Sequence, residues 1–183
     1  AIGAGLACGG FCIQFGCDWT AFFYASIAAI LGNRLRMFLN HSGSNLYANF
    51  AVAAFVSTIL AWLSSFLSTP TVQAALPEFL RPILFTETPW HPLLACALYI
   101  VPGVPLINAV NDLLDNNINT GLVRAMNTLL IVIAMSFGIM LAIKCGSFDG
   151  FAKNLSTIPH HSFYVYAIAA AISAMGFATI YNI

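Results

Sequence analysis

Charged residues are scarce in this sequence of 183 residues. Asp, Glu, Lys and Arg together make up 7% of it, whereas hydrophobic residues make up 60%. Soluble domains are typically about 25% charged. A soluble core of this size could not hide so much apolar surface, because small domains keep much of their surface in contact with water. The composition therefore predicts an integral membrane protein.

Other features that the chain lacks exclude whole classes of function. Its net charge is zero and no basic run is present, so no nucleic-acid partner is expected. Its five cysteines include no CxxC pair, which argues against a disulfide framework or a zinc ribbon and favours small buried hydrophobes. The His160-His161 pair has no partner at ligand spacing, so no metal site is predicted. No GxSxG, HExxH, phosphate-loop or DxD pattern occurs, which predicts neither an enzyme nor a cofactor.

Apolar segments divide the chain into an all-α bundle of about five to six transmembrane helices, since one span needs about 20 residues. The expected segments are residues 1–16, 19–39, 46–67, 92–114, 119–143 and 162–181. The polar connection over 68–91 should carry one short amphipathic helix, over 72–80, in the membrane interface. A second polar loop covers 145–161. The first residue is not Met and no charged leader precedes the apolar start, so we expect both ends to be cuts through a longer protein.

Helix signals support two of these segment boundaries. Asp18 stands in the N-cap position of the second segment. Arg34 and Arg36 lie in the last turns of that segment, where cations suit a helix C-terminus.

The fourth segment is interrupted by Pro102, Gly103 and Pro105. Each proline removes a backbone donor and clashes with the preceding helical turn. The second half should therefore begin at Pro105 and run to about Leu114. Non-helical backbone at membrane depth is tolerated only where protein buries it or water reaches it. Broken helices near the midplane hold substrates in many secondary transporters, so this break is the predicted substrate site.

Two ionisable residues follow the break. Asp112 is a functional candidate if it lies at membrane depth, where it could carry a coupling proton. Alternatively, the half-helix ends early and Asp112 is solvated; Asp115 is a weaker candidate of the same kind. Arg124 could pair with Asp112 across the short turn, or bind a cargo carboxylate with two N–H groups. The alternative for Arg124 is an interfacial side chain that reaches the lipid headgroups.

Amide side chains near the break could supply hydrogen bonds to a small polar substrate. The substrate-binding candidates are Asn108, Asn111 and Asn119, and Asn108 shares a helix face with the first aspartate. Asn127 is a lesser candidate, because an amide between helices more often serves packing. Asp18 is also a lesser candidate, since its capping position already explains it.

The first and last segments echo each other. Residues 1–11 (AIGAGLACGGF) match 167–177 (AIAAAISAMGF) in size and type at nearly every place, and an aromatic residue follows at Phe15 and Tyr181. Helices rich in small residues also resemble one another by chance. If the echo is real, residue 167 opens a second repeat, as in many secondary transporters.

The block PGVPLINAVND (102–112), followed by NTGLVR (119–124), resembles the threonine/serine exporter (ThrE) family and is closest to its YjjP branch. Gly-Gly-Phe in the first segment and Asp18-Trp19 also fit. The resemblance covers residues 1–145. After a connecting loop over 146–161, residues 162–183 are similar to the first helix of a YjjB-like second half.

The resemblance implies a multi-pass secondary-active exporter in the inner (plasma) membrane, built from two halves of about five spans each. Its cargo would be threonine and serine, or succinate, and we expect proton coupling. Expected partners are the small-molecule cargo, membrane lipid and a YjjB-like half, fused or separate, in an oligomer. Two alternatives remain from the residues: a passive channel, and a non-transporting scaffold subunit of a two-part membrane complex.

Overall fold

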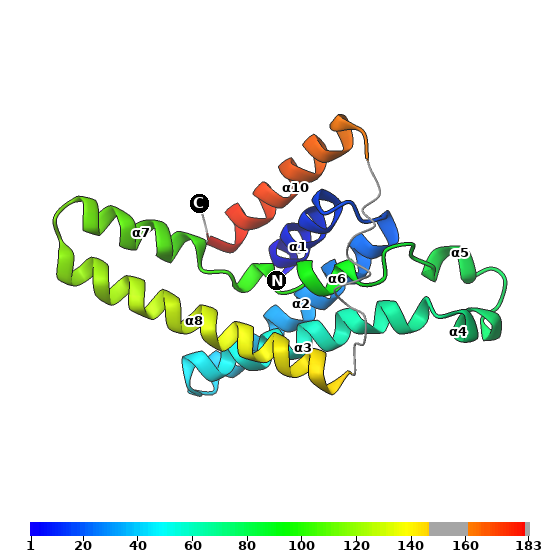
Figure 1. Ribbon diagram of the computed structural model, residues 1–183, viewed down its shortest axis with the longest axis horizontal. Helices are drawn as coiled ribbons and strands as arrows, with labels where there is room; N and C mark the ends of the chain where they lie inside the picture. Colours follow the sequence, from blue (N-terminus) through cyan, green and yellow to red (C-terminus); the bar gives the residue numbers. More distant parts are fainter. Residues whose placement is uncertain (147–160, 182–183) are drawn as a thin grey trace.

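The computed structural model describes residues 1–146 and 161–181, which form helices joined by short connections (Figure 1). The prediction of an all-α membrane bundle is confirmed. The helices are α1 (Ile2–Gln14), α2 (Trp19–His41), α3 (Leu46–Leu67), α4 (Pro70–Ala75), α5 (Arg81–Leu84), α6 (His91–Ala95), the 3-10 helix η1 (Leu98–Ile100), α7 (Gly103–Leu114), α8 (Ile118–Cys145) and α10 (Phe163–Tyr181). Most of the expected loop over 146–161 lies outside the described residues.

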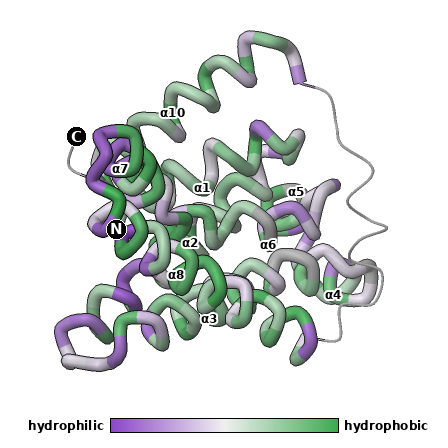
Figure 2. Tube along the Cα trace, turned by 60° about the vertical axis from the view of Figure 1, so that its left-hand side comes forward, coloured by the Kyte–Doolittle hydropathy of each residue, from purple (hydrophilic) through white to green (hydrophobic). Residues whose placement is uncertain are grey.

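Three of the described helices are long and apolar enough to cross a membrane, namely α3, α8 and α10. A fourth span results if α6 and η1 are joined with α7, across a bend of 52°. The expected count of five to six is higher, because α1 has 13 residues and polar Asn33, Arg34 and Arg36 occupy the last turns of α2. Figure 2 shows hydrophobic residues along most of the helices. The chain is thus a multi-pass membrane protein.

The core lies where α1, α2, α3 and η1 meet, and small side chains dominate it. Cys8 of α1 and Ala29 of α2 are fully buried around Tyr99 of η1. The Tyr99 hydroxyl oxygen lies 3.1 Å from Oγ of Ser57 on α3. A Cβ on Gly32 would lie 2.6 Å from that hydroxyl, so this glycine lets η1 sit directly against α2. Small residues allow this close approach, which helices in membranes depend on for packing.

The connection after α3 differs from the prediction of one helix over 72–80. It contains the two short helices α4 and α5, and Leu76 between them has an extended backbone with ψ of 146°. The reason is local, because Pro77 disfavours helical geometry in the residue before it. The Arg81 side chain donates to the carbonyl oxygens of Leu76 at 3.1 Å and Ala74 at 3.2 Å, which ties the two helices together.

The break in the fourth segment is present, but its second half starts earlier than predicted. Helix α7 begins at Gly103, with Pro102 as N-cap and Pro105 within the first turn. A proline is tolerated there, because a first-turn N–H would have no helical partner in any case. The first half consists of α6 and η1 rather than one continuous helix.

Helices α7 and α8 form an antiparallel hairpin that projects from the remaining helices (Figure 1). The turn contains Asn116 at φ 63°, a left-handed conformation that asparagine tolerates better than most residues. A Cβ on Gly121 of α8 would lie 2.6 Å from Cγ of Leu113 and 3.1 Å from the carbonyl oxygen of Ala109. The glycine therefore brings α8 close to α7 and sets which side chains meet across the hairpin.

Candidate functional site

Asp112 of α7 and Arg124 of α8 form an ion pair near the closed end of the hairpin. Nη1 of Arg124 donates to Oδ2 of Asp112 at 2.5 Å. The Asp112 side chain is 20% exposed and the Arg124 side chain 52% exposed. The pairing suggested by the sequence is therefore present, and the carboxylate is the better shielded of the two partners.

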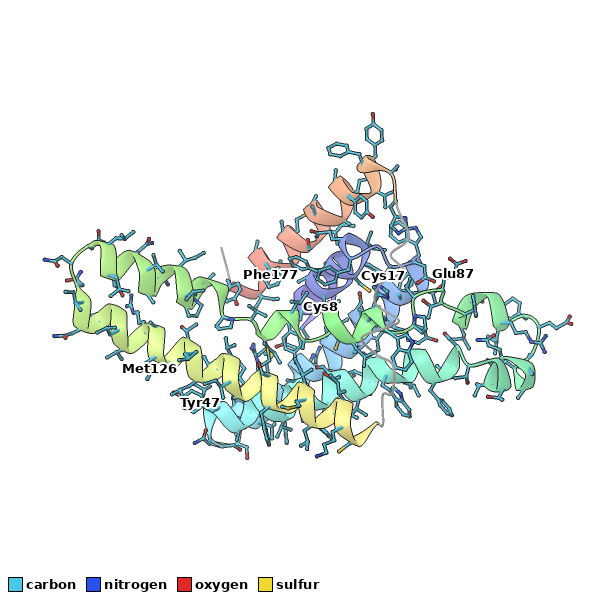
Figure 3. All side chains as sticks on the ribbon, viewed as in Figure 1. Cys8, Cys17, Tyr47, Glu87, Met126 and Phe177 are labelled. Atoms are coloured by element: carbon cyan, nitrogen blue, oxygen red, sulfur yellow. The ribbon has the colours of Figure 1, made fainter. Side chains whose placement is uncertain are left out.

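The predicted amide side chains are spread over the hairpin. Asn108, Asn111 and Asn119 are exposed. Oδ1 of Asn127 accepts a hydrogen bond from the Tyr47 hydroxyl at 2.7 Å, which links α8 to α3; Figure 3 shows Tyr47 on α3 facing α8. Asn127 thus takes part in packing between helices, the role that the sequence analysis considered more common for such an amide.

A cavity of about 450 Å³ lies beside the break, between α1, η1, α7 and α10, and we call it the break cavity. Of the predicted site residues, Gly103 lines it, together with Val101 and Val104. Its other walls are apolar apart from Tyr181, whose hydroxyl donates to the carbonyl oxygen of Val101 at 2.9 Å. A carbonyl freed by the break is therefore already paired, and the cavity suits a hydrocarbon group better than a charged one.

Arg36 lies close to the break, although its position in the sequence indicated only a cation near the C-terminus of α2. The central carbon of its guanidinium lies 5.3 Å from the ring centre of Phe50 and 5.7 Å from that of Tyr99, within cation–π range. Tyr99 belongs to η1, the last piece of helix before the break. Nε of Arg36 and Oδ1 of Asn33 are both buried, and neither has a hydrogen-bond partner among the described residues. Asn33 is only 5% exposed. The signal available in the sequence was Asn33 and Arg36 one helical turn apart, directly after the apolar stretch of α2.

A second cavity, of about 550 Å³, opens onto these polar groups, and we call it the arginine cavity. It is lined by Asn33, Arg34 and Arg36 of α2, with residues from the start of α1 and the end of α10. A guanidinium offers N–H groups in the geometry that a carboxylate accepts. Leaving a buried donor unpaired costs about 1–3 kcal/mol, so an anion that pairs with Arg36 would recover that loss. The arginine cavity is therefore a candidate carboxylate site next to the break.

Asp18 caps α2 as predicted, since its Oδ1 accepts from the Ala21 N–H at 3.3 Å. The same carboxylate accepts from the hydroxyls of Thr86 at 2.5 Å and Thr88 at 3.0 Å, and from the Glu87 N–H at 3.3 Å. Figure 3 shows Glu87 beside the turn between α1 and α2. Asp18 therefore anchors the connection that leads into the broken helix.

His161 and four of the five cysteines take part in helix packing. Nε2 of His161 lies 2.8 Å from the carbonyl oxygen of Cys17, while His160 lies outside the described residues. The buried cysteines are Cys8, Cys12, Cys17 and Cys96, which matches the expectation of small core residues. Within 1–146 and 161–181, no three His, Cys, Asp or Glu side chains are grouped so as to hold a metal ion.

Comparison with known proteins matches residues 1–146 to a family described as "Putative threonine/serine exporter". Two similar curated proteins are each named "Probable succinate transporter subunit YjjP". The one from Klebsiella aerogenes is 32% identical over 148 residues, which are 81% of this chain and 52% of that protein. The one from Escherichia coli K12 is 30% identical over 150 residues, 82% of this chain and 53% of that protein. The chain thus spans about half the length of these relatives. No solved structure matches it.

Proposed function

The chain belongs to the threonine/serine exporter (ThrE) family, and on that basis we propose that it forms one half of a secondary-active exporter of small carboxylate-bearing metabolites. The resemblance noted from the PGVPLINAVND and NTGLVR blocks is confirmed by this membership. The family description supports threonine and serine as cargo, and the name of the two relatives supports succinate. Both point to transport rather than catalysis, and the word subunit supports a second protein half as partner.

The observation that carries the proposal is the half-buried Arg36 beside the broken helix, whose Nε is fully buried. The Arg124 charge is already balanced by Asp112. In contrast, Nε of Arg36 is buried with no hydrogen-bond partner in the described part of the chain, and it adjoins a cavity large enough for a small metabolite. Charge-assisted hydrogen bonds are the stronger class. We therefore place the cargo carboxylate on Arg36, with Asn33 as a second polar contact.

The break supplies the moving part of the proposed mechanism. Helix α7 starts at Gly103 beside the apolar break cavity, and Pro102 and Pro105 fix that start. The aliphatic part of the cargo would pass along this cavity, while the exposed amides of the hairpin would meet its polar groups. Alternating access would follow from rocking this half against its partner, as repeat-built transporters do.

The Asp112–Arg124 pair is the proposed coupling element. Protonation of Asp112 would remove its negative charge and release Arg124 from the pair, so the hairpin would have two electrostatic states. Ionisable residues at membrane depth commonly serve proton relays in transporters. The inner membrane is the proposed location, because a proton gradient across that membrane would drive the export.

Replacing Arg36 by Gln is expected to reduce export at least about tenfold, because losing one charge-assisted hydrogen bond removes about 1.5–3 kcal/mol. The measurement follows labelled threonine and labelled succinate leaving cells that carry the full-length protein with its second half. Lys144→Gln is the matched control, since Lys144 is exposed in the last turn of α8 and the same charge is lost there. Immunoblots of isolated membranes correct each rate for the amount of protein.

The outcomes separate the rival functions. Loss of export in Arg124→Ala, with Arg36→Gln active, would assign the carboxylate to Arg124 instead. Export that follows the cargo gradient and ignores a protonophore would identify a passive channel. If neither cargo leaves the cells, the exporter proposal fails for both, and a scaffold subunit becomes the better description.

A further inference from the structure

Helices α1 and α10 pack against each other in opposite directions, as Figure 1 shows. They are also the two helices whose sequences echo each other. Residue 1 aligns with residue 167, an offset of 166 positions, so every residue in α1 has an equivalent in α10. The packing can therefore be tested for symmetry residue by residue.

The close contacts between the two helices obey this offset. A Cβ on Gly10 would lie 2.8 Å from Cβ of Ser173, and a Cβ on its equivalent Gly176 would lie 2.8 Å from Cα of Ala7. Ala7 and Ser173 are themselves equivalents. Shifting both residues of a contact by 166 positions gives another observed contact in two cases. The contact of Gly10 with Ser173 corresponds to that of Gly176 with Ala7, and the contact of Gly10 with Ala169 corresponds to that of Gly176 with Gly3. The residues that contact Gly10 on α10 are therefore the sequence equivalents of the residues that contact Gly176 on α1.

Phe11 and Phe177 are equivalent residues that touch each other. Their ring centres lie 5.6 Å apart in an edge-to-face arrangement, and Figure 3 shows Phe177 on the side of α10 that faces α1. Contact between equivalent residues is the mark of a two-fold axis. Because the helices are antiparallel, this axis runs across them. Helix α10 is long enough to cross a membrane, and the axis across it and the shorter α1 would then lie in the membrane plane, which is the arrangement of inverted repeats.

The two helices differ in what covers their other faces. Helix α1 has a second buried face against α2, α6 and η1, made of Gly5, Cys8, Gly9 and Cys12. The equivalents in α10 are Ala171, Ala174, Met175 and Ala178, which we call the open face of α10. None of these four residues is buried, and Met175 is 59% exposed. Within residues 1–146 and 161–181, the open face therefore lacks the close cover that the second face of α1 has.

The contacts of α1 indicate what covers the open face. Sγ of Cys8 donates to the carbonyl oxygen of Cys96 at 3.7 Å, between α6 and η1. Cys12 packs in one cluster with Ala95 and Leu98. The second face of α1 thus holds the first half of the broken helix. In α10 the equivalents Ala174 and Ala178 line the break cavity, opposite α7.

We infer that the open face of α10 seats the broken helix of a second, inverted repeat, and that the two breaks face each other across the break cavity. The inference rests on the proposed function for the existence of the second half, in the same chain or in a separate subunit. Its position comes from the geometry, because the open face is continuous with the α1–α10 interface and the two-fold axis there maps one half onto the other.

Photo-crosslinking in membranes tests this arrangement. Benzoylphenylalanine is placed at Ala174 or Ala178 in the full-length protein with its second half. The matched control is Ile168, which is 57% exposed and whose equivalent, Ile2, is 72% exposed on α1. Mass spectrometry is expected to map the Ala174 and Ala178 adducts to the second-half counterpart of residues 95–100. The Ile168 probe is expected to react with lipid.

Two results would overturn the inference. Lipid adducts at both open-face positions would leave that face uncovered, and adducts on residues 1–146 of an isotope-labelled second copy would identify a homo-oligomer instead. The probes replace side chains that are not buried, so folding should tolerate them. The readout needs no transport. An inactive protein with the expected adduct contradicts only the proposed function, whereas an active exporter with lipid adducts contradicts only this inference.

Discussion

Asp112→Asn is expected to uncouple export from the proton gradient and to lower accumulation against a cargo gradient at least about tenfold, which corresponds to about 1.4 kcal/mol. An amide carries no titrating proton and no charge to balance Arg124, so the pair would have one electrostatic state instead of two. The Arg124 side chain is 52% exposed, so water can solvate its charge once the carboxylate is neutralised, and the substitution should leave the fold intact. The measurement is export of labelled cargo over a range of external pH, with and without a protonophore.

Asp115→Asn is the matched control for this substitution. Asp115 is the C-cap of α7, is exposed, and lies three residues after Asp112 on the same helix. Export and its pH dependence should survive the change there. Normal export with unaltered pH dependence in Asp112→Asn would contradict the coupling role. The ion pair would then have only a structural role, holding α7 against α8.

Gly176→Leu is expected to force α1 and α10 apart and to cause a large loss of folded protein. A Cβ at this position would meet the backbone nitrogen of Ala7 and lie 2.7 Å from the carbonyl oxygen of Gly3. Inserting methylenes into packed cores typically costs about 1–3 kcal/mol, and backbone atoms cannot swing aside as a side chain does. Thermal unfolding of the purified protein in detergent, followed by tryptophan fluorescence, should show a clearly lower midpoint.

Gly103→Leu makes the same chemical change where a Cβ would have nothing within 4 Å, so its unfolding midpoint should stay close to that of the unmodified protein. Gly10→Leu should behave like Gly176→Leu, because the two glycines occupy equivalent places in the interface. Equal midpoints for Gly176→Leu and Gly103→Leu would mean that α1 and α10 do not pack through these glycines.

Local chemistry made much of the fold predictable from the sequence. The predicted bounds of the third segment are those of α3, Asp18 caps α2, and the break lies at the two prolines, because each feature depends on residues within one or two helical turns. The Asp112–Arg124 pair could also be anticipated, since a short turn brings neighbouring helices side by side. Where local signals competed, the prediction was wrong by a few residues, as at Gly103 and Leu76.

The sequence by itself determined that this chain is a helical membrane protein with a broken helix, because composition and proline chemistry act locally. It offered the Asp112–Arg124 pair as one of several roles for Arg124, and the structure shows that pair. Only the tertiary structure decided that Arg36 lies against Tyr99 beside the break, and that Gly10 and Gly176 bring α1 and α10 together about a two-fold axis. Those residues are far apart along the chain. Which distant helices meet depends on how their surfaces of small residues fit together, and that fit is a property of the assembled bundle.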